Sequence, residues 1–578
     1  MSDVITDNLA VWTAAIEKKS AAGRGSNNKQ TAYGIKKLRE LILELAVRGK
    51  LVPQDPNDEP AGVLLEKIAE EKARLIKEGK IKKQKALPEI GEDEKLFELQ
   101  DGWVWTKLGN ISEINPRNVA EDEIDASFIP MSFISNSHSG SHDQEIRTWG
   151  LIKKGYTHFA DSDIGLAKIT PCFENGKAAV FSNLKNGIGA GTTELHIARP
   201  FGNTLNPRYI LIFLKAPQFL LTGEKIMTGT AGQKRVPKDF FAGNPLPLPP
   251  LSEQHRIVAK VDELMVLCDQ LEQQQTDSIV AHQTLVATLL QTLTDSENAE
   301  QLAQNWTILS DHFGTLFTTE PSIDQLKQTL LQLAVMGKLA PQDPNDEPAG
   351  VLLEKIAEEK ARLIQEGKLK KQKALPGIEE DEKPFELPDG WAWGRLGNVT
   401  NYGVSDKVEP NSVTDSTWVL ELEDVEKVTS KILKKVRYSE RNFKSSKNCF
   451  RKNDVIYGKL RPYLDKVLVA DEDGVCTTEM IPLRGFAKIN PFYLRLVMKS
   501  PFFIRYANDS THGMNLPRMG TDKARMALFP ITSESEQHRI VAKVDELMAL
   551  CDQLKAKISQ AQATQILLAD AIVEQAIA

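Results

Sequence analysis

Few stretches of this 578-residue chain have the residue types and spacing that catalysis or cofactor binding requires. The sequence lacks a GxxxxGKS/T phosphate loop and a glycine-rich fingerprint after a strand, which argues against an NTP motor of that class and against a nucleotide cofactor. It also lacks HExxH and GxSxG motifs and any Cys/His cluster with metal-ligand spacing. We therefore expect no catalytic residues, no metal and no cofactor in this chain. Its five cysteines fit buried free thiols: Cys172, Cys268, Cys449, Cys476 and Cys551.

One pattern with possible chemistry is Asn-Pro-x-Tyr, at residues 206–209 and again at 490–493. It is similar to the Asn-Pro-Pro-Tyr loop of adenine methyltransferases. An apolar stretch with helical character follows in both places, asparagine is a favoured N-cap, and proline suits the first helical position. Since no cofactor loop accompanies the pattern, we interpret both copies as helix starts.

Basic residues gather in two stretches of a chain whose net charge is -7 and whose pI is about 5.9. Between Arg147 and Asp239 there are 13 Lys/Arg against 6 Asp/Glu, and between Lys427 and Arg525 there are 21 against 9. Local basic surfaces on an acidic chain are typical of a DNA reader, because cations that contact phosphates release counterions. The alternative for either stretch alone is an ordinary basic domain, and finding two in parallel positions weakens it.

A repeated framework must position these basic stretches. The 44 residues from Leu45 recur from Leu333 with four differences (repeat A), and the 20 residues from Ser252 recur from Ser535 with one (repeat B). The order A, variable segment, B occurs twice, as in a fused dimer. We expect five regions: an N-terminal helical region (1–96), a variable domain (97–251), a central helical region (252–384), a second variable domain (385–534) and a C-terminal helix (535–578).

The repeats read as helices and the variable segments as mixed structure. Apolar periodicity predicts a helix over residues 33–47, with its counterpart over 323–337; we call these two the repeat-A helices, because each runs into a copy of repeat A. A second helix is predicted over 61–78, within the repeat. Each variable segment alternates short strand-like runs with short helices, which indicates a compact α/β domain. Repeat B has apolar residues at alternating steps of four and three, as in an antiparallel coiled-coil spacer whose stripe packs on the other copy: Ile257, Val261, Leu264, Cys268 and Leu271, and Ile540, Val544, Leu547, Cys551 and Leu554.

The bulk composition indicates a soluble protein. A hydrophobic content of 41% suffices for several cores, and no apolar run approaches the ~18 residues of a membrane span. The first residues lack the layout of a signal peptide. We expect a cytoplasmic protein without a membrane partner.

Three phrases identify the chain as resembling a known family: PLPPLSEQHRIVAKVDELM, DVIYGKLRPYLDKVLVADEDGVCTTE and LAVRGKLVPQDPNDEPA. Together with the layout of two divergent domains between repeated helical regions, they resemble the specificity subunit of Type I restriction–modification enzymes. The resemblance covers essentially the whole chain.

The resemblance implies a non-catalytic subunit with two target recognition domains. Each domain would read one half of an asymmetric split site on double-stranded DNA, with the halves about one helical turn apart. The repeats would set the spacing and dock two methyltransferase subunits, which bind S-adenosylmethionine and methylate adenine. Motor–nuclease subunits, which use ATP and Mg, would join them.

Base-edge contacts need arginine or lysine for guanine and asparagine or glutamine for adenine. Polar glycine-containing loops near the end of each variable segment supply such residues, as do two strand-like positions. The alternatives for each residue are a phosphate contact or simple exposure. Our candidates are Lys168, Gln233, Lys234, Arg235 and Lys238 in the first segment, and Lys459, Arg461, His512, Asn515, Arg518, Lys523 and Arg525 in the second.

Two other functions remain open from the sequence. A two-headed protein-binding adaptor without a DNA role would fit the acidic net charge, and salt-dependent DNA binding would separate it from a DNA reader. A self-sufficient methyltransferase would need a cofactor site that the sequence does not show.

Overall fold

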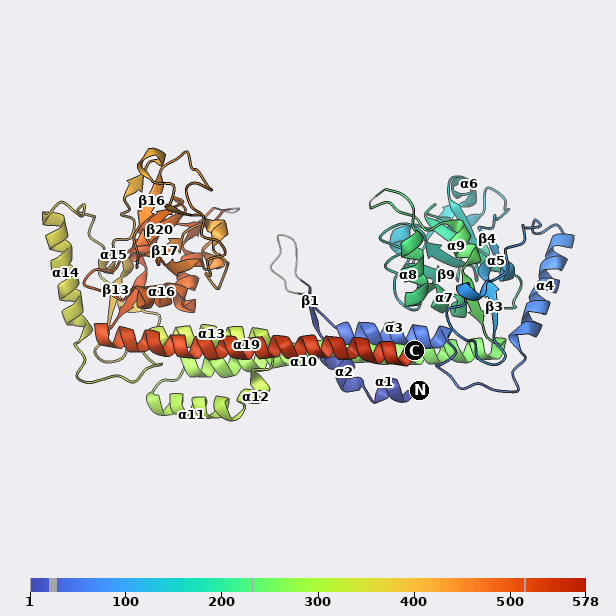
Figure 1. The fold of residues 1–578 in the computed structure, drawn as a ribbon, viewed down its shortest axis with the longest axis horizontal. Coiled ribbons are helices and arrows are strands. Elements are labelled where there is room, and N and C mark those ends of the chain that lie inside the picture. Colours follow the sequence, from blue (N-terminus) through green and yellow to red (C-terminus); the bar gives the residue numbers. More distant parts are fainter. Residues whose placement is uncertain (1, 20–28, 231, 514–515) are drawn as a thin grey trace. The chain divides into compact units, whose positions relative to one another are not determined.

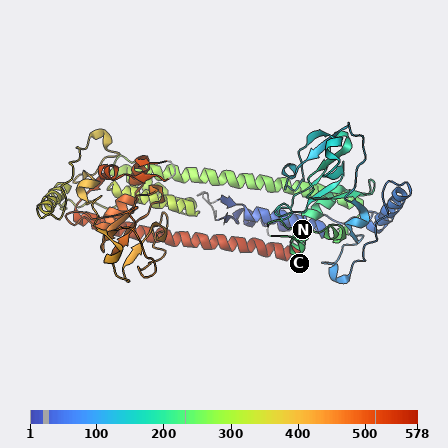
Figure 2. The same cartoon turned by 90° about the horizontal axis from the view of Figure 1, so that it is seen from above.

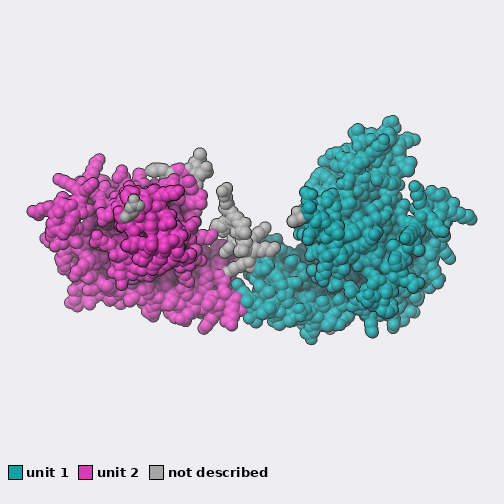
Figure 3. Space-filling model, turned by 45° about the horizontal axis from the view of Figure 1, so that its top comes forward, with its two compact units in different colours: residues 1–278, 561–578 teal, residues 279–560 magenta. Residues whose placement is uncertain are grey.

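The computed structural model describes residues 2–19, 29–230, 232–513 and 516–578 of the chain. These residues form two compact units (Figures 1 and 3). Unit 1 consists of Met1–Ser278 and Ala561–Ala578, and unit 2 of Ile279–Gln560. Each unit contains one variable α/β domain and a helical part, so the predicted fold class is confirmed.

Variable domain 1, in unit 1, contains two four-stranded sheets, ordered β6-β5-β10-β7 and β4-β11-β8-β9, and the pair β3-β12. Its strands are β3 (Val104–Lys107), β4 (Ser112–Ile114), β5 (Asp125–Ile129), β6 (Glu145–Thr148), β7 (Thr157–Ala160), β8 (Ile164–Ala167), β9 (Ala178–Val180), β10 (Ile188–Gly191), β11 (Leu195–Pro200) and β12 (Pro245–Leu248). Its helices are α5 (Leu108–Ile111), α6 (Trp149–Ile152), α7 (Pro207–Lys215), α8 (Pro217–Ile226) and α9 (Lys238–Gly243).

Variable domain 2, in unit 2, contains sheets ordered β14-β16-β19-β15 and β18-β17-β20 and the pairs β13-β23 and β21-β22. Its strands are β13 (Ala392–Arg395), β14 (Lys407–Val408), β15 (Trp418–Leu420), β16 (Lys447–Phe450), β17 (Val455–Gly458), β18 (Val467–Val469), β19 (Gly474–Cys476), β20 (Met480–Leu483), β21 (Thr511–His512), β22 (Arg518–Met519) and β23 (Leu528–Ile531). Its helices are α15 (Leu396–Val399), α16 (Pro491–Lys499), α17 (Pro501–Asp509) and α18 (Thr521–Met526).

The two variable domains share an unusual strand pairing. β5 pairs with β10 in parallel, as β15 does with β19, and a glycine in each second strand faces a phenylalanine on the antiparallel neighbour. A Cβ on Gly189 would lie 2.5 Å from the Phe159 ring, and one on Gly474 would lie 2.5 Å from the Phe450 ring. Only glycine lets the ring lie against the strand at these points, so both sheets are built around the same close contact.

Helices account for the repeats and the segments around them, and those predicted from the sequence are present to within a few residues. The N-terminal elements are α1 (Ser2–Thr6), α2 (Leu9–Ala14), β1 (Glu17–Lys19), β2 (Lys29–Thr31), α3 (Tyr33–Val47) and α4 (Ala61–Lys77). The central ones are α10 (Leu251–Thr294), α11 (Ala299–Asp311), α12 (Phe313–Leu316), α13 (Glu320–Val335) and α14 (Ala349–Gln365), and α19 (Glu534–Ile577) ends the chain.

The apolar stripe of each repeat-B helix packs on a repeat-A helix, which the periodicity did not predict. In unit 1, α3 lies between the start of α10 and the end of α19 (Figure 2) and contributes buried residues to a core shared with both. Arg39 of α3 pairs with Asp269 of α10, and Tyr33 of α3 donates to Asp570 of α19 at 2.7 Å. In unit 2, α13 shares cores with α10 and α19 in the same way. Each unit therefore has a three-helix arrangement rather than a two-stranded coil.

The repeated phrase SEQHR is the joint between each variable domain and its repeat-B helix. In unit 1, Glu253 accepts a hydrogen bond from the Trp103 indole at 3.0 Å, and Gln254 accepts one from the backbone N–H of Asn206, also at 3.0 Å. Arg256 pairs with Asp58 in the loop after α3 at 2.6 Å. The corresponding contacts in unit 2 are Trp391–Glu536, Asn490–Gln537 and Arg539–Asp346. Both variable domains are thus mounted by the same side chains.

Candidate nucleic-acid interface

In variable domain 1, the segment after β8 meets the polar loop that precedes α9. Backbone hydrogen bonds join Lys168 N–H to the Glu194 carbonyl at 2.9 Å and Val236 N–H to the Lys168 carbonyl at 2.8 Å. A β-bridge between Ile169 and Arg235 continues this contact. The sequence candidates Lys168 and Arg235 therefore lie on neighbouring strands of backbone, although 67 residues separate them in the chain.

Variable domain 2 repeats this geometry with different residues. Lys459 N–H donates to the Glu479 carbonyl at 3.0 Å, and Met519 N–H donates to the Lys459 carbonyl at 3.1 Å. Leu460 forms a β-bridge with Arg518. Lys459 and Arg518 thus occupy the positions of Lys168 and Arg235.

An arginine–glutamate pair ties the two segments together in each domain. Arg235 contacts Glu194 through Nε at 2.9 Å and Nη2 at 2.8 Å, and Arg518 contacts Glu479 through Nε at 3.0 and 3.2 Å. The hydrogen bonds from Arg235 hold the pKa of Glu194 below its usual value. Arg235 is held through two nitrogens, which fixes the orientation of its guanidinium, whereas Arg518 uses Nε alone. Both arginines are paired in this way on a partly exposed surface.

Both arginines and both lysines are among the candidates predicted from the sequence, whereas neither glutamate is. Glu194 and Glu479 each end the short phrase Thr-Thr-Glu, which stands at corresponding places in the two variable segments. That coincidence in two otherwise dissimilar segments was the available signal.

Most other candidates lie on or beside the same loops. Gln233 and Lys234 are exposed, Lys238 begins α9 and is also exposed, and Lys523 is exposed in α18. Arg461 is exposed and left-handed (φ 52°), and the neighbouring Tyr463 is 51% exposed. His512 pairs with Arg518 in the register of β21 and β22, whereas Asn515 lies outside the described residues.

Arg525 does not fit a DNA contact. It is only 9% exposed, its Nη2 donates to the Lys373 carbonyl at 3.2 Å, and its side chain lies against Gly397. Helix α18 turns Lys523 outward and Arg525 inward, a distinction that the sequence of a short polar stretch does not reveal.

A buried lysine holds the loop that follows β8 in variable domain 1, and another holds the loop that follows β17 in variable domain 2. Lys215, the last residue of α7, donates to the Gly176 carbonyl at 2.7 Å. Lys499, the last residue of α16, donates to the Asp465 carboxylate at 2.6 Å and to the Val428 carbonyl at 2.7 Å. These cations hold loops rather than meet a ligand, so they subtract from the basic balance counted in the sequence.

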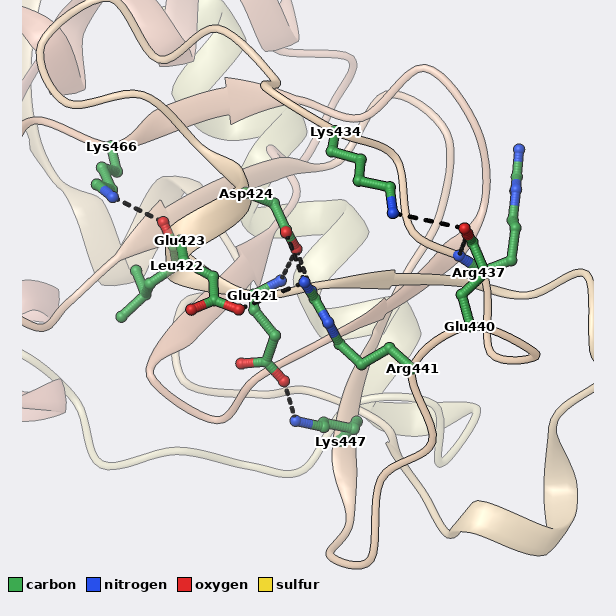
Figure 4. A network of polar contacts seen from close by, with 10 residues as sticks. All are labelled: Glu421, Leu422, Glu423, Asp424, Lys434, Arg437, Glu440, Arg441, Lys447 and Lys466. Atoms are coloured by element: carbon green, nitrogen blue, oxygen red, sulfur yellow. Dashed lines mark hydrogen bonds and ion pairs between the residues drawn. The ribbon is translucent and has the colours of Figure 1, made fainter.

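Ion pairs within variable domain 2 neutralise further basic side chains of this domain (Figure 4). The acidic turn at Glu421–Asp424 is neutralised by Arg441, which contacts Asp424, and by Lys447, which contacts Glu421. Lys466 donates to the Leu422 carbonyl at 2.6 Å, as Lys177 of variable domain 1 does to the Met131 carbonyl at 3.1 Å. The exposed basic surface is therefore concentrated on fewer residues than the count of +12 suggests.

The described residues offer little else that could do chemistry. Asn206 and Asn490 cap α7 and α16 by accepting from backbone N–H groups, which confirms the helix-start interpretation of Asn-Pro-x-Tyr. Within the described part of the chain, no group of three or more His, Cys, Asp or Glu side chains could hold a metal ion. Among the same residues, no helix is long and apolar enough to cross a membrane.

Comparisons with known proteins show the family that this chain is similar to. Residues 100–281 match the family model for the Type I restriction modification DNA specificity domain. The chain is 53% identical, over 99% of both chains, to the Type I restriction enzyme EcoAI specificity subunit of Escherichia coli, and 49% identical, again over 99% of both, to the EcoEI specificity subunit. The HsdS subunit from Thermoanaerobacter tengcongensis matches 83% of this chain and 98% of its own at 17% identity, with a TM-score of 0.41. The chain belongs to the specificity subunits of Type I restriction–modification enzymes.

Proposed function

We propose that each variable domain reads one half of a split DNA site and that the chain itself catalyses no step. The observation that carries this proposal is the shared lysine–glutamate–arginine arrangement on two domains of different sequence. Lys168, Glu194 and Arg235 in one domain correspond to Lys459, Glu479 and Arg518 in the other. A specificity subunit with two different readers on one repeated scaffold specifies two different half-sites.

The loops beside this arrangement supply groups suited to bases and phosphates. Gln233 and Lys234 in variable domain 1, and Arg461 and Tyr463 in variable domain 2, are exposed. Glutamine suits adenine, lysine and arginine suit guanine or a phosphate, and an exposed tyrosine can pack on a base or sugar. The spacing of the half-sites, about one turn of the duplex, would follow from the repeat-B helices with their stripes of buried apolar residues.

The outer faces of α4 and α14 support docking of two identical subunits. Their inner faces hold the variable domains: Lys72 donates to the Gly109 carbonyl and Lys360 to the Gly397 carbonyl. Their outer faces are exposed and yet match in the two copies except at the last residue, where α4 has Lys77 and α14 has Gln365, with Lys67 and Arg74 repeated as Lys355 and Arg362. Since the fold does not require exposed side chains to match, a common partner explains the identity. We assign this surface to two adenine methyltransferase subunits, through which motor–nuclease subunits join.

The first test is sequencing of methylated adenines in cells that carry this system, with and without the chain. We expect deletion to erase a motif of two unlike halves separated by a fixed gap. An unchanged methylation pattern, with the methyltransferase subunits present and active, would overturn the proposed function.

A sharper test substitutes the arginines one at a time in the assembled complex. Arg235→Ala should weaken or relax recognition of one half-site and Arg518→Ala the other, because each frees one reading loop. A lost base contact costs ~1–3 kcal/mol at that position, whereas a lost phosphate contact weakens all sequences and lowers the salt slope by about one. Lys154→Ala and Lys444→Ala remove exposed cations outside these loops and serve as matched controls. Equal effects of both arginine variants on both halves would contradict two independent readers.

A further inference from the structure

The apolar contact between repeat-A and repeat-B helices is interchangeable between the two halves of the chain. In unit 1, α3 packs on α10, and in unit 2, α13 packs on α19. The residues concerned match in position and are apolar in both copies: Ile35, Leu38, Ile42 and Leu45 of α3 correspond to Ile323, Leu326, Leu330 and Leu333 of α13, and Ile257, Val261, Leu264 and Cys268 of α10 correspond to Ile540, Val544, Leu547 and Cys551 of α19. Each repeat-A helix packs on the start of one repeat-B helix and on the end of the other. Apolar packing alone therefore cannot decide which repeat-B helix contributes its start.

The ion pairs that flank this apolar contact differ between the halves. One pair is common: Arg39 contacts Asp269 at 2.6 Å in unit 1, and at the matching positions Lys327 contacts Asp552 in unit 2. Three residues further along the repeat-B helix the charge is reversed, because Lys555 stands where the first copy has Glu272.

Each helix pair is complementary at this reversed position. In unit 1, Glu272 accepts from Arg39 at 2.6 Å, and Lys36 stands one turn away on α3. In unit 2, Lys555 contacts Asp324 at 2.7 Å and lies 4.0 Å from Glu320. Asp324 occupies the position of Lys36, so the charges on both helices of the pair are exchanged together.

Exchange of partners would turn these attractions into repulsions. A pairing of α3 with the start of α19 would bring Lys555 beside Lys36 and Arg39. A pairing of α13 with the start of α10 would bring Glu272 beside Asp324 and Glu320. Partly exposed pairs contribute modestly one at a time, but two lost attractions and two new repulsions together disfavour exchange by roughly tenfold at low salt.

We propose that this reversal of charge keeps each repeat-A helix on the start of the repeat-B helix of its own half, and so disfavours dimers in which α3 of one copy joins the start of α19 of another. A fused dimer whose two halves have matching apolar contacts is exposed to domain swapping. A dimer that joins α3 of one copy to the start of α19 in another keeps those apolar contacts and changes only the charged ones. Charged flanks around an apolar seam are an effective way to choose between such partners. The proposal rests on the helical contacts alone and does not depend on the proposed function.

The test uses four variants of the full chain, refolded from denaturant under reducing conditions at low salt and then examined by size-exclusion chromatography with light scattering. Glu272→Lys combined with Lys555→Glu makes own pairs repulsive and exchanged pairs attractive, so its dimer fraction should rise about tenfold over wild type. Glu272→Lys alone should lower the melting temperature. Glu272→Lys with Lys36→Asp rebuilds the charge pattern of unit 2 in unit 1 and should recover the melting temperature.

Asp277→Lys is the matched control, since it makes the same charge change at an exposed site on the same helix. It should leave both the dimer fraction and the melting temperature at their wild-type values, and 1 M salt should remove the differences among all variants. The proposal is overturned if Glu272→Lys with Lys555→Glu dimerises no more than Asp277→Lys, or if Lys36→Asp fails to rescue Glu272→Lys.

Discussion

A buried lysine ends α7 in variable domain 1 and α16 in variable domain 2, and each holds the loop after β8 or β17. The two lysines nevertheless have different surroundings. Lys499 contacts the Asp465 carboxylate, the Ser430 hydroxyl and the Val428 carbonyl. Lys215 donates to the Gly176 carbonyl, and no carboxylate of the described residues lies within ion-pair distance of it. The same position holds the same loop in both domains, while the charge is compensated in only one. The backbone arrangement is therefore common to the two domains, whereas the side chains that surround the lysine differ between them.

Under the proposed function, the same distinction would separate residues that position loops from residues that read DNA. The arginine–glutamate pairs are common to both domains, so by themselves they cannot specify what differs between two half-sites. Thr170 and Cys172 in variable domain 1 stand where variable domain 2 has Arg461 and Tyr463. Under the proposed function, discrimination between half-sites lies mainly in such differing positions, on loops that the common residues hold in place.

The largest effect that would sharpen this comparison is expected from Lys499→Met. The substitution leaves the Asp465 carboxylate buried without its cation, which costs ~3–5 kcal/mol of unfolding free energy. Lys215→Met removes a buried charge that lacks a counter-ion and should change stability by less than about 1 kcal/mol, or increase it. Hydrogen exchange resolved by unit measures each change separately. Equal losses from the two variants would show that the surroundings of the two lysines are energetically equivalent.

The pH dependence of the two units should differ for the same reason. Burial lowers the pKa of Lys215 to about 7 in the folded chain, whereas an unfolded lysine titrates near 10.5. Between these values the unfolded state binds more protons, so the free energy of unfolding of unit 1 rises with pH, by about 2 kcal/mol from pH 7 to 9. Below pH 7 both states are protonated and this dependence ends. Lys215→Met should flatten the rise in unit 1, and a slope that survives the substitution would assign it to another group.

Much of this arrangement is visible in the sequence. Apolar periodicity predicts α3, α4, α13 and α14, and the alternating steps of four and three predict α10 and α19, because such spacing over a long segment is typical of a helix with one buried face. The three-helix packing could not be predicted, because an apolar stripe on a helix shows that the helix packs against another element but does not show which element. The joint residues of SEQHR were visible as an exact repetition, but their contacts lie 48 to 198 residues away in the first copy.

The candidate interface was only partly predictable. Lysines and arginines in polar loops point to DNA by type, so Lys168, Arg235, Lys459 and Arg518 were among the candidates, and their contact with DNA stays a prediction. Type does not show which cations are already paired within the domain, and Lys215, Arg441 and Lys447 counted toward a basic surface although they hold loops. Arg525 was misplaced for the same reason, because burial of one side of a six-residue helix depends on packing that no local pattern encodes.

Two glycines test whether the sheets share one frame. Gly189→Ala would place a Cβ 2.5 Å from the Phe159 ring and 2.8 Å from the Ser127 carbonyl oxygen, and Gly474→Ala would place one 2.5 Å from the Phe450 ring. Overpacking of this kind costs about 1–3 kcal/mol. We expect similar losses in the two units by hydrogen exchange, with Gly62→Ala as a control because no atom lies within 4 Å of its added Cβ. A loss confined to one unit would break the equivalence of the sheets.

The smallest expected effect concerns the joint, where the two halves are most alike. Arg256→Ala and Arg539→Ala each remove a partly exposed arginine from a mostly buried aspartate, Asp58 or Asp346. Each loss should be ~0.5–1 kcal/mol and equal in the two halves, because the residues around the joint are the same. Double-mutant cycles with Asp58→Ala and Asp346→Ala isolate the pair energies from other effects of the substitutions. Unequal coupling energies would mean that the differing residues of the variable domains change the strength of the arginine–aspartate pair at the joint.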